Sequence, residues 1–100
     1  MTVFPLADGR LIAITTSSGP SSYSSGGFSV TVSELRKVEQ VIAVYADAGY
    51  LCTGSPGTGN AVTVKAYYFD YDASADGAAI EVADGTDLSG VTFTVVAIGF

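Results

Sequence analysis

The residues with the clearest capacity for chemistry lie in one acidic segment of the second half of the chain. Four carboxylates fall at positions 1, 3, 7 and 12 of a stretch that begins at residue 70: Asp70, Asp72, Asp76 and Glu81. Calcium-binding EF-hand loops space their oxygen ligands in this way. However, Ala75 stands where such a loop needs glycine, and strand-like sequence flanks the segment in place of helices. The alternatives are therefore a calcium site or a solvated acidic loop between strands; we prefer the loop and predict no cofactor.

Other catalytic patterns are missing from the sequence. The chain has no histidine, so its single cysteine, Cys52, and its many serines lack the usual general base. The glycine-rich stretch at 54–60, GSPGTGN, lacks the lysine and the following helix of a phosphate-binding loop. We therefore predict that the protein is not an enzyme, and we interpret Cys52 as a small apolar core residue.

Composition and charge exclude several classes of partner. The net charge of −6 and only four basic residues disfavour binding to a phosphate backbone. The apolar runs are far shorter than the ~20 residues that span a bilayer, and the N-terminus does not resemble a secretory signal. A single cysteine suits folding in a reducing cytoplasm. Charged residues make up only 14% of the chain, which favours a subunit whose surface is covered in an assembly.

Hydrophobic periodicity predicts an all-β protein. Alternating or β-branched segments separated by Gly, Ser and Asp turns predict strands at 10–15, 28–33, 41–45, 50–53, 61–70 and 91–98. One helical turn is expected near 33–38, because Ser33 can cap it and Leu35 and Val38 would share its inner side. The expected fold is an antiparallel β-sandwich or small barrel of about six to eight short strands.

The chain is long enough for one domain. Residues 1–9 form an N-terminal arm, either an edge strand or a segment whose Phe4 and Leu6 dock on a neighbouring subunit. Residues 10–100 form a single β domain with a flexible Ser/Gly loop at 16–27. Within this loop, Tyr23 is either part of a simple connection or a contact for a partner.

Four segments of the sequence resemble a known class of proteins: SVTVSELRKVEQVIAVY, GNAVTVKAYYFDYD, a D-L-S-G turn and the terminal VTFTVVAIG. Over residues 27–99 the chain resembles small β-sandwich virion proteins of tailed bacteriophages and related viruses. The tyrosine-rich acidic segment at 67–81 departs from that pattern.

The resemblance implies a non-enzymatic virion structural protein, first a capsid decoration (cement) protein that binds the major capsid shell. Its partners would be the capsid protein and other copies of itself, as a homo-oligomer and most simply a trimer, without nucleic acid or membrane. It would lie on the capsid surface after assembly in the host cytoplasm. A tail or baseplate component and a lectin-like receptor-binding module are the alternatives. The predicted contact residues are Phe4, Leu6, Tyr23, Arg36 and Lys37.

Overall fold

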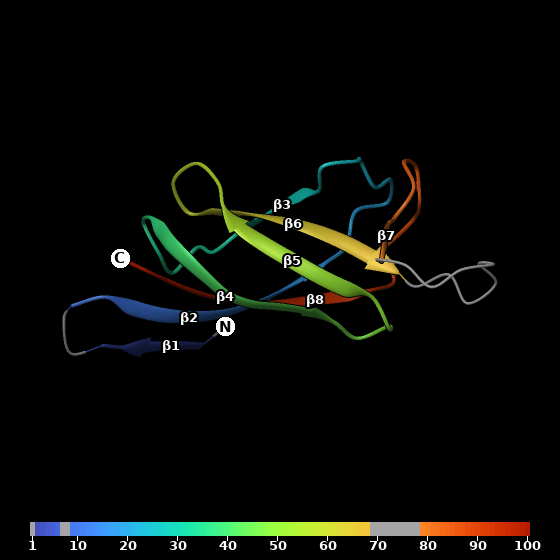
Figure 1. The fold of residues 1–100 in the computed structure, drawn as a ribbon. Coiled ribbons are helices and arrows are strands. Elements are labelled where there is room, and N and C mark those ends of the chain that lie inside the picture. Colours follow the sequence, from blue (N-terminus) through green and yellow to red (C-terminus); the bar gives the residue numbers. More distant parts are fainter. Residues whose placement is uncertain (1, 7–8, 69–78) are drawn as a thin grey trace.

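The fold is all-β, as the sequence predicts. A computed structural model describes residues 2–6, 9–68 and 79–100, and these contain eight strands. In chain order the strands are β1 (Thr2–Pro5), β2 (Leu11–Ser18), β3 (Phe28–Thr31), β4 (Val38–Ala46), β5 (Leu51–Pro56), β6 (Ala61–Tyr68), β7 (Ile80–Glu81) and β8 (Thr92–Gly99). They form two antiparallel sheets that lie across one another (Figure 1).

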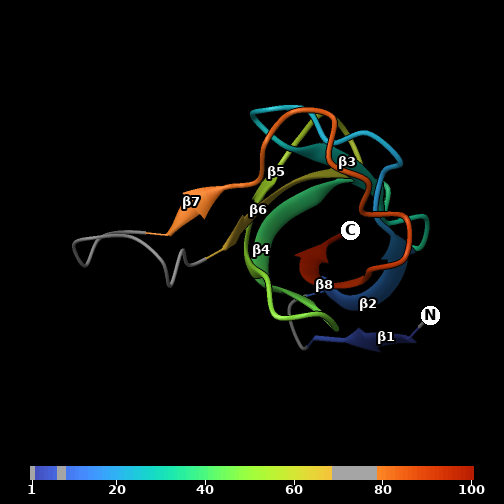
Figure 2. The same ribbon diagram turned by 90° about the vertical axis from the view of Figure 1, so that its right-hand side faces the viewer.

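The last strand of the chain organises the first sheet, whose order is β1-β2-β8-β4. Strand β8 pairs with β2 along its whole length, from Leu11 opposite Gly99 to Ser18 opposite Thr92. On its other side β8 pairs with β4, whose ladder contains two irregularities. The second sheet has the order β3-β6-β5, and the short β7 extends it by pairing with the end of β6. Figure 2 shows the two sheets curving around a common interior.

Alternation along the central strands builds the core between the sheets. Ala13 and Val95 from the first sheet and Val62 and Val64 from the second are fully buried. Because successive side chains of a strand point to opposite faces, each strand gives only every second residue to this core. Phe93 closes the core at one end, where its ring packs edge-on against Phe28 with centroids 5.0 Å apart.

The expected helical turn near 33–38 is wrong, because the residues that the structure describes contain no helix. A tight turn replaces it, closed by the Leu35 N–H, which donates to the Val32 carbonyl at 3.0 Å. The following backbone bonds to neighbouring segments: Val38 N–H donates to the Gly59 carbonyl, and Lys37 accepts from Phe100. Leu35 and Val38 are nevertheless buried, as predicted, since the turn directs them inward just as a helical turn would.

The N-terminal arm forms an edge strand, one of the two alternatives drawn from the sequence. Strand β1 pairs with β2 from Thr2 opposite Ile14 to Pro5 opposite Leu11.

In the part of the chain that the structure describes, no helix is long and apolar enough to cross a membrane.

Candidate functional site

The outward side of the first sheet carries an apolar surface. Ala13 of β2 and Val95 and Ala97 of β8 point into the core, so the residues between them face outward. We call this surface the outer face; its large side chains are Phe4, Ile12, Ile14, Ile42, Tyr45, Val96 and Ile98. The ladders bring them together, because Ile12 lies opposite both Phe4 and Ile98, and Ile14 lies opposite Val96.

The outer face has uncharged rows and is partly exposed: Ile12, Ile14, Val96 and Ile98 in its centre are half-buried, and its margins are open. Phe4, Ile42 and Tyr45 are 50%, 54% and 59% exposed, although each is a large apolar or aromatic residue. The rows of facing residues that run from Phe4–Ile12 to Thr94–Tyr45 contain no charged side chain. Monomeric soluble proteins seldom leave a contiguous apolar patch of this kind uncovered, so the outer face is the principal candidate for an interaction site.

Sequence reasoning missed most of this surface. The prediction included Phe4, which is half exposed on β1, and Leu6, which is partly buried where β1 ends. It assigned Ile12, Ile14 and Val96 only to strands. The available signal was that 11–14 and 95–98 are apolar at consecutive positions, a pattern typical of a sheet covered on both faces.

Basic residues gather at one end of the first sheet. Arg36 and Lys37 are exposed, as predicted, and hydrogen bonds between their backbone and that of Phe100 hold them beside the end of β8. Arg10 directly precedes β2 at the same end, where its guanidinium Nη1 lies 3.8 Å from Glu39 Oε1. Three of the chain's four cations therefore share this end of the first sheet, together with the carboxylates Glu34 and Glu39. It is the end at which the C-terminus lies, on the left in Figure 1.

Carboxylates occupy the opposite end. Asp47 follows β4 there, and its side chain accepts a hydrogen bond from the Thr92 N–H at the start of β8. The loops around β7 and before β8 add further carboxylates at this end: Glu81, Asp84 and Asp87. Charges are therefore unevenly distributed along the described chain: three cations outnumber two carboxylates at one end, and carboxylates outnumber cations at the other.

Tyr23 belongs to the core, which corrects its assignment as a surface contact. Its side chain is only 1% exposed, and its ring lies edge-on to Phe28 with centroids 6.3 Å apart. The surrounding connection is shorter than the expected loop, because β2 extends to Ser18. Backbone hydrogen bonds join Tyr23 N–H to the Thr86 carbonyl and Gly85 N–H to the Tyr23 carbonyl. The serine- and glycine-rich segment therefore packs against the loop that follows β7.

The hydroxyl of Tyr23 connects three segments. It donates to Glu81 Oε2 at 2.7 Å and accepts from the Ala66 N–H at 3.2 Å. Burial raises the pKa of Tyr23 to about 12, so the hydroxyl keeps its proton in neutral solution. The hydrogen bonds from Tyr23 and from the Gly26 N–H lower the pKa of the Glu81 carboxyl. Glu81 is thus held ionised as the acceptor of this network.

The calcium candidates are only partly covered by the structure, because Asp70, Asp72 and Asp76 lie outside the described residues. Glu81 is described, and both of its oxygens accept hydrogen bonds from the chain, Oε1 from Ser25 and Oε2 from Tyr23 and Gly26. Among the described residues no group of three or more His, Cys, Asp or Glu side chains is arranged to hold a metal ion.

Cys52 lies partly buried on β5, where its thiol approaches the Tyr50 carbonyl at 3.9 Å. Burial raises the pKa of this thiol, which keeps it protonated and therefore weakly nucleophilic. Both features agree with its interpretation as an apolar packing residue.

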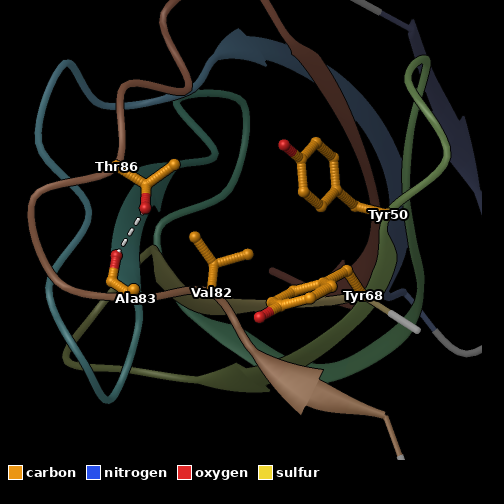
Figure 3. Close-up of a pocket in the computed structure, with 5 residues that line it drawn as sticks. All are labelled: Tyr50, Tyr68, Val82, Ala83 and Thr86. Carbon is orange, nitrogen blue, oxygen red and sulfur yellow. Dashed lines mark hydrogen bonds between the residues drawn. The ribbon is translucent and has the colours of Figure 1, made fainter. Parts of the chain in front are cut away.

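A pocket of about 360 Å³ lies between β6 and the loop after β7 (Figure 3). The described residues that line it are Tyr50, Tyr68, Val82, Ala83 and Thr86. The Thr86 hydroxyl donates to the Ala83 carbonyl at 2.7 Å, so it is already engaged. This lining supplies apolar and aromatic surface without a carboxylate, amine or thiol for acid–base or nucleophilic work.

No family model matches the chain, and comparisons with curated proteins and with solved structures find no match.

Proposed function

We propose that this protein is a non-enzymatic structural component of a virus particle, a capsid decoration protein that binds the major capsid shell as a symmetric oligomer. The observation that carries the proposal is the outer face, a partly exposed apolar side of a four-stranded sheet without charges along its rows. The sequence resemblance to small virion proteins is the reason for proposing a virus particle as the assembly.

The proposed mechanism uses two surfaces. The outer face packs against neighbouring subunits, which buries its apolar side chains away from water. The basic end, with Arg36 and Lys37, approaches an acidic patch of the shell, which steers attachment and makes it sensitive to salt. Each contact is modest, but repetition over a symmetric shell converts weak contacts into firm retention.

A tail or baseplate subunit is the nearest alternative, because it would use the same apolar face for assembly. A lectin-like module that binds through calcium is less favoured, since the oxygens of Glu81 already accept hydrogen bonds from Tyr23, Ser25 and Gly26. A calcium titration of the full chain separates these classes: the proposal expects no rise in the thermal midpoint, and a rise that EDTA reverses would favour the lectin-like module.

Particle association tests the proposal directly. Purified chain is mixed with shells assembled without it, and the mixture is separated on a density gradient. We expect the chain to move with the shells at a fixed ratio to the capsid protein and to saturate as its concentration rises. Chain that stays at the top of the gradient at every concentration would contradict the proposal, while binding to isolated tails would favour the tail alternative.

A further inference from the structure

The geometry of the outer face points to a specific occupant, and we propose that it pairs with the outer face of a second copy of this chain, turned end for end about a two-fold axis. The inference rests on the proposed function, in which the chain works as a self-associating subunit, and it names the surface and the symmetry of that contact.

Edge-to-edge pairing is the usual alternative for a sheet, but both edges of the first sheet are poorly suited to it. Strand β1 is only four residues long and ends in Pro5, which cannot donate a backbone hydrogen bond. Strand β4 carries irregularities between Val38 and Gln40 and between Val41 and Ala43, and such bulges interrupt the regular ladder that an added strand needs. The side of the sheet is therefore better suited to a partner than its edges.

The irregularities of β4 also serve the outer face. Val41 packs against the core, whereas Ile42, the next residue, falls within the second irregularity and is more than half exposed. The bulge therefore turns an extra large apolar side chain toward the outside beside Val96. Two residues further on, Val44 packs inward and Tyr45 again points outward.

The size of the outer face fits a modest pair of identical subunits. Four strands about 4.8 Å apart, with about five residues each, span on the order of 300 Å² before side-chain relief is counted. With that relief, two copies bury on the order of 1,000 Å², the size of a weak specific interface. Such a pair forms at micromolar concentrations and gains strength when it is repeated in an assembly.

Charge selects a second copy and its orientation. An acidic chain repels its own copies, but the rows of the outer face are uncharged and can approach without like-charge contacts. At the basic end Arg10, Arg36 and Lys37 outnumber the carboxylates Glu34 and Glu39. A two-fold axis that crosses the strands places this end beside the partner's acidic end, which includes Asp47. The parallel orientation would bring like ends together, so the end-for-end arrangement is the favourable one.

Sedimentation equilibrium of the full chain tests the inference. We expect a reversible monomer–dimer equilibrium between about 1 and 200 µM, weakened as salt rises because the charged ends attract each other. Ile14→Lys places an ammonium group in the middle of the face and should raise the dissociation constant about tenfold or more. Leu51→Lys is the matched control, because Leu51 is an exposed apolar residue on β5 of the other sheet; its effect should stay within about twofold.

Circular dichroism shows whether each variant folds, and Ile42→Lys replaces Ile14→Lys if the latter does not, since Ile42 is more exposed. A monomer at every concentration, a trimer, or equal weakening by Leu51→Lys would each overturn the inference. A dimer that never joins shells would support the inference and contradict the proposed function. A monomer that decorates shells at a fixed ratio would support the proposed function and contradict the dimer.

Discussion

At the scale of single residues, the hydroxyl of Tyr23 makes two hydrogen bonds to distant segments, and one substitution removes both. Its hydroxyl supplies an acceptor to the Ala66 N–H, which lies between the part of β6 that pairs with β3 and the part that pairs with β7. The ladder is interrupted at this point, and a tyrosine from a distant loop completes it. The Tyr23 hydroxyl also donates a hydrogen bond to the carboxylate of Glu81.

Tyr23→Phe should therefore destabilise the protein by about 1–3 kcal/mol, because it leaves a buried N–H without its acceptor and removes a charged hydrogen bond. Urea denaturation followed by far-ultraviolet circular dichroism measures the loss. Tyr68→Phe is the matched control, since Tyr68 is 39% exposed and water can occupy the place of the lost hydroxyl. The free energy of unfolding should change by less than about 0.5 kcal/mol. Equal effects of the two variants would contradict the role given to Tyr23.

The pH dependence of stability follows from Glu81. Its pKa is lowered in the folded protein by the Tyr23 hydroxyl and the Gly26 N–H, so the folded state binds its proton less readily than the unfolded chain does. The contribution of Glu81 is thus present above the unfolded pKa of about 4.3 and disappears as the pH falls through the lower folded value.

Glu81→Gln should consequently lower the thermal midpoint at pH 7, and the difference from the natural protein should shrink as the pH falls below about 4. Thermal melts across the acid range measure this difference. Asp87→Asn is a comparison of the same kind, because hydrogen bonds with Ser89 in its own turn also lower the pKa of Asp87, and its effect should fade in acid in the same way. A difference for Glu81→Gln that stays constant into strong acid would show that charge is not the cause.

Sequence reasoning succeeded for residues whose environment is local and failed for those whose partners are distant. Leu35 and Val38 were assigned to the core from their spacing within one turn, and they are buried. Tyr23 was assigned to a surface because its neighbours are serine and glycine. Its ring and hydroxyl meet partners as far as Glu81, 58 residues away, which no local pattern reveals.

At the scale of elements, the two sheets are joined where β4 passes to β5, and a glycine permits their close approach. An added Cβ at Gly54 would lie 2.5 Å from Val44 Cγ2 and 2.9 Å from Val41 Cγ1, both on β4. These valines pack against the core, so they cannot move aside without disturbing it. A small residue at position 54 is therefore a requirement of how the sheets meet.

Gly54→Ala should destabilise the fold by about 1–3 kcal/mol through overpacking, even though alanine is otherwise the better residue in a strand. Gly90→Ala is the matched control, because a Cβ at Gly90 would meet nothing within 4 Å. Chemical denaturation of both variants gives the comparison. If Gly54→Ala is as stable as Gly90→Ala, the close contact between β4 and β5 does not limit this position.

Most strands were predictable because their apolar residues alternate, as in β6, or are β-branched, as in β8. The order of the strands was not, because β2 and β8 pair across nearly the whole chain and no local pattern records that pairing. The outer face depends on this order, since Ile14 and Val96 become neighbours only when β2 and β8 pair.

At the scale of the whole molecule, folding gathers most of the cations at one end of the first sheet. Arg10 is 26 positions from Arg36 in the sequence, yet both stand at the end of the first sheet where Leu11, Gly99 and Val38 lie in one row. Asp47, Glu81, Asp84 and Asp87 lie at the other end, while Glu34 and Glu39 stand with the three cations. The two ends therefore differ in charge, and in the proposed function this difference orients the chain on a shell.

Charge reversal at the basic end tests that use. Arg36→Glu together with Lys37→Glu should leave the fold intact, because both side chains are exposed and their backbone makes the hydrogen bonds with Phe100. Attachment to shells should weaken about tenfold or more at low salt, and the difference from the natural protein should narrow as salt rises, since screening removes the attraction that the reversal abolishes.

The measurement is the fraction of chain that moves with shells on a density gradient, recorded at several salt concentrations. Lys65→Glu is the matched control, because Lys65 lies on β6, in the second sheet and away from the basic end. It changes the net charge in the same direction, so a general effect of acidity would appear in both proteins. If Lys65→Glu weakens attachment per charge as much as the reversal at Arg36 and Lys37, overall charge and not the basic end governs docking. If the double variant unfolds, the corner before β4 serves only to hold the sheets together.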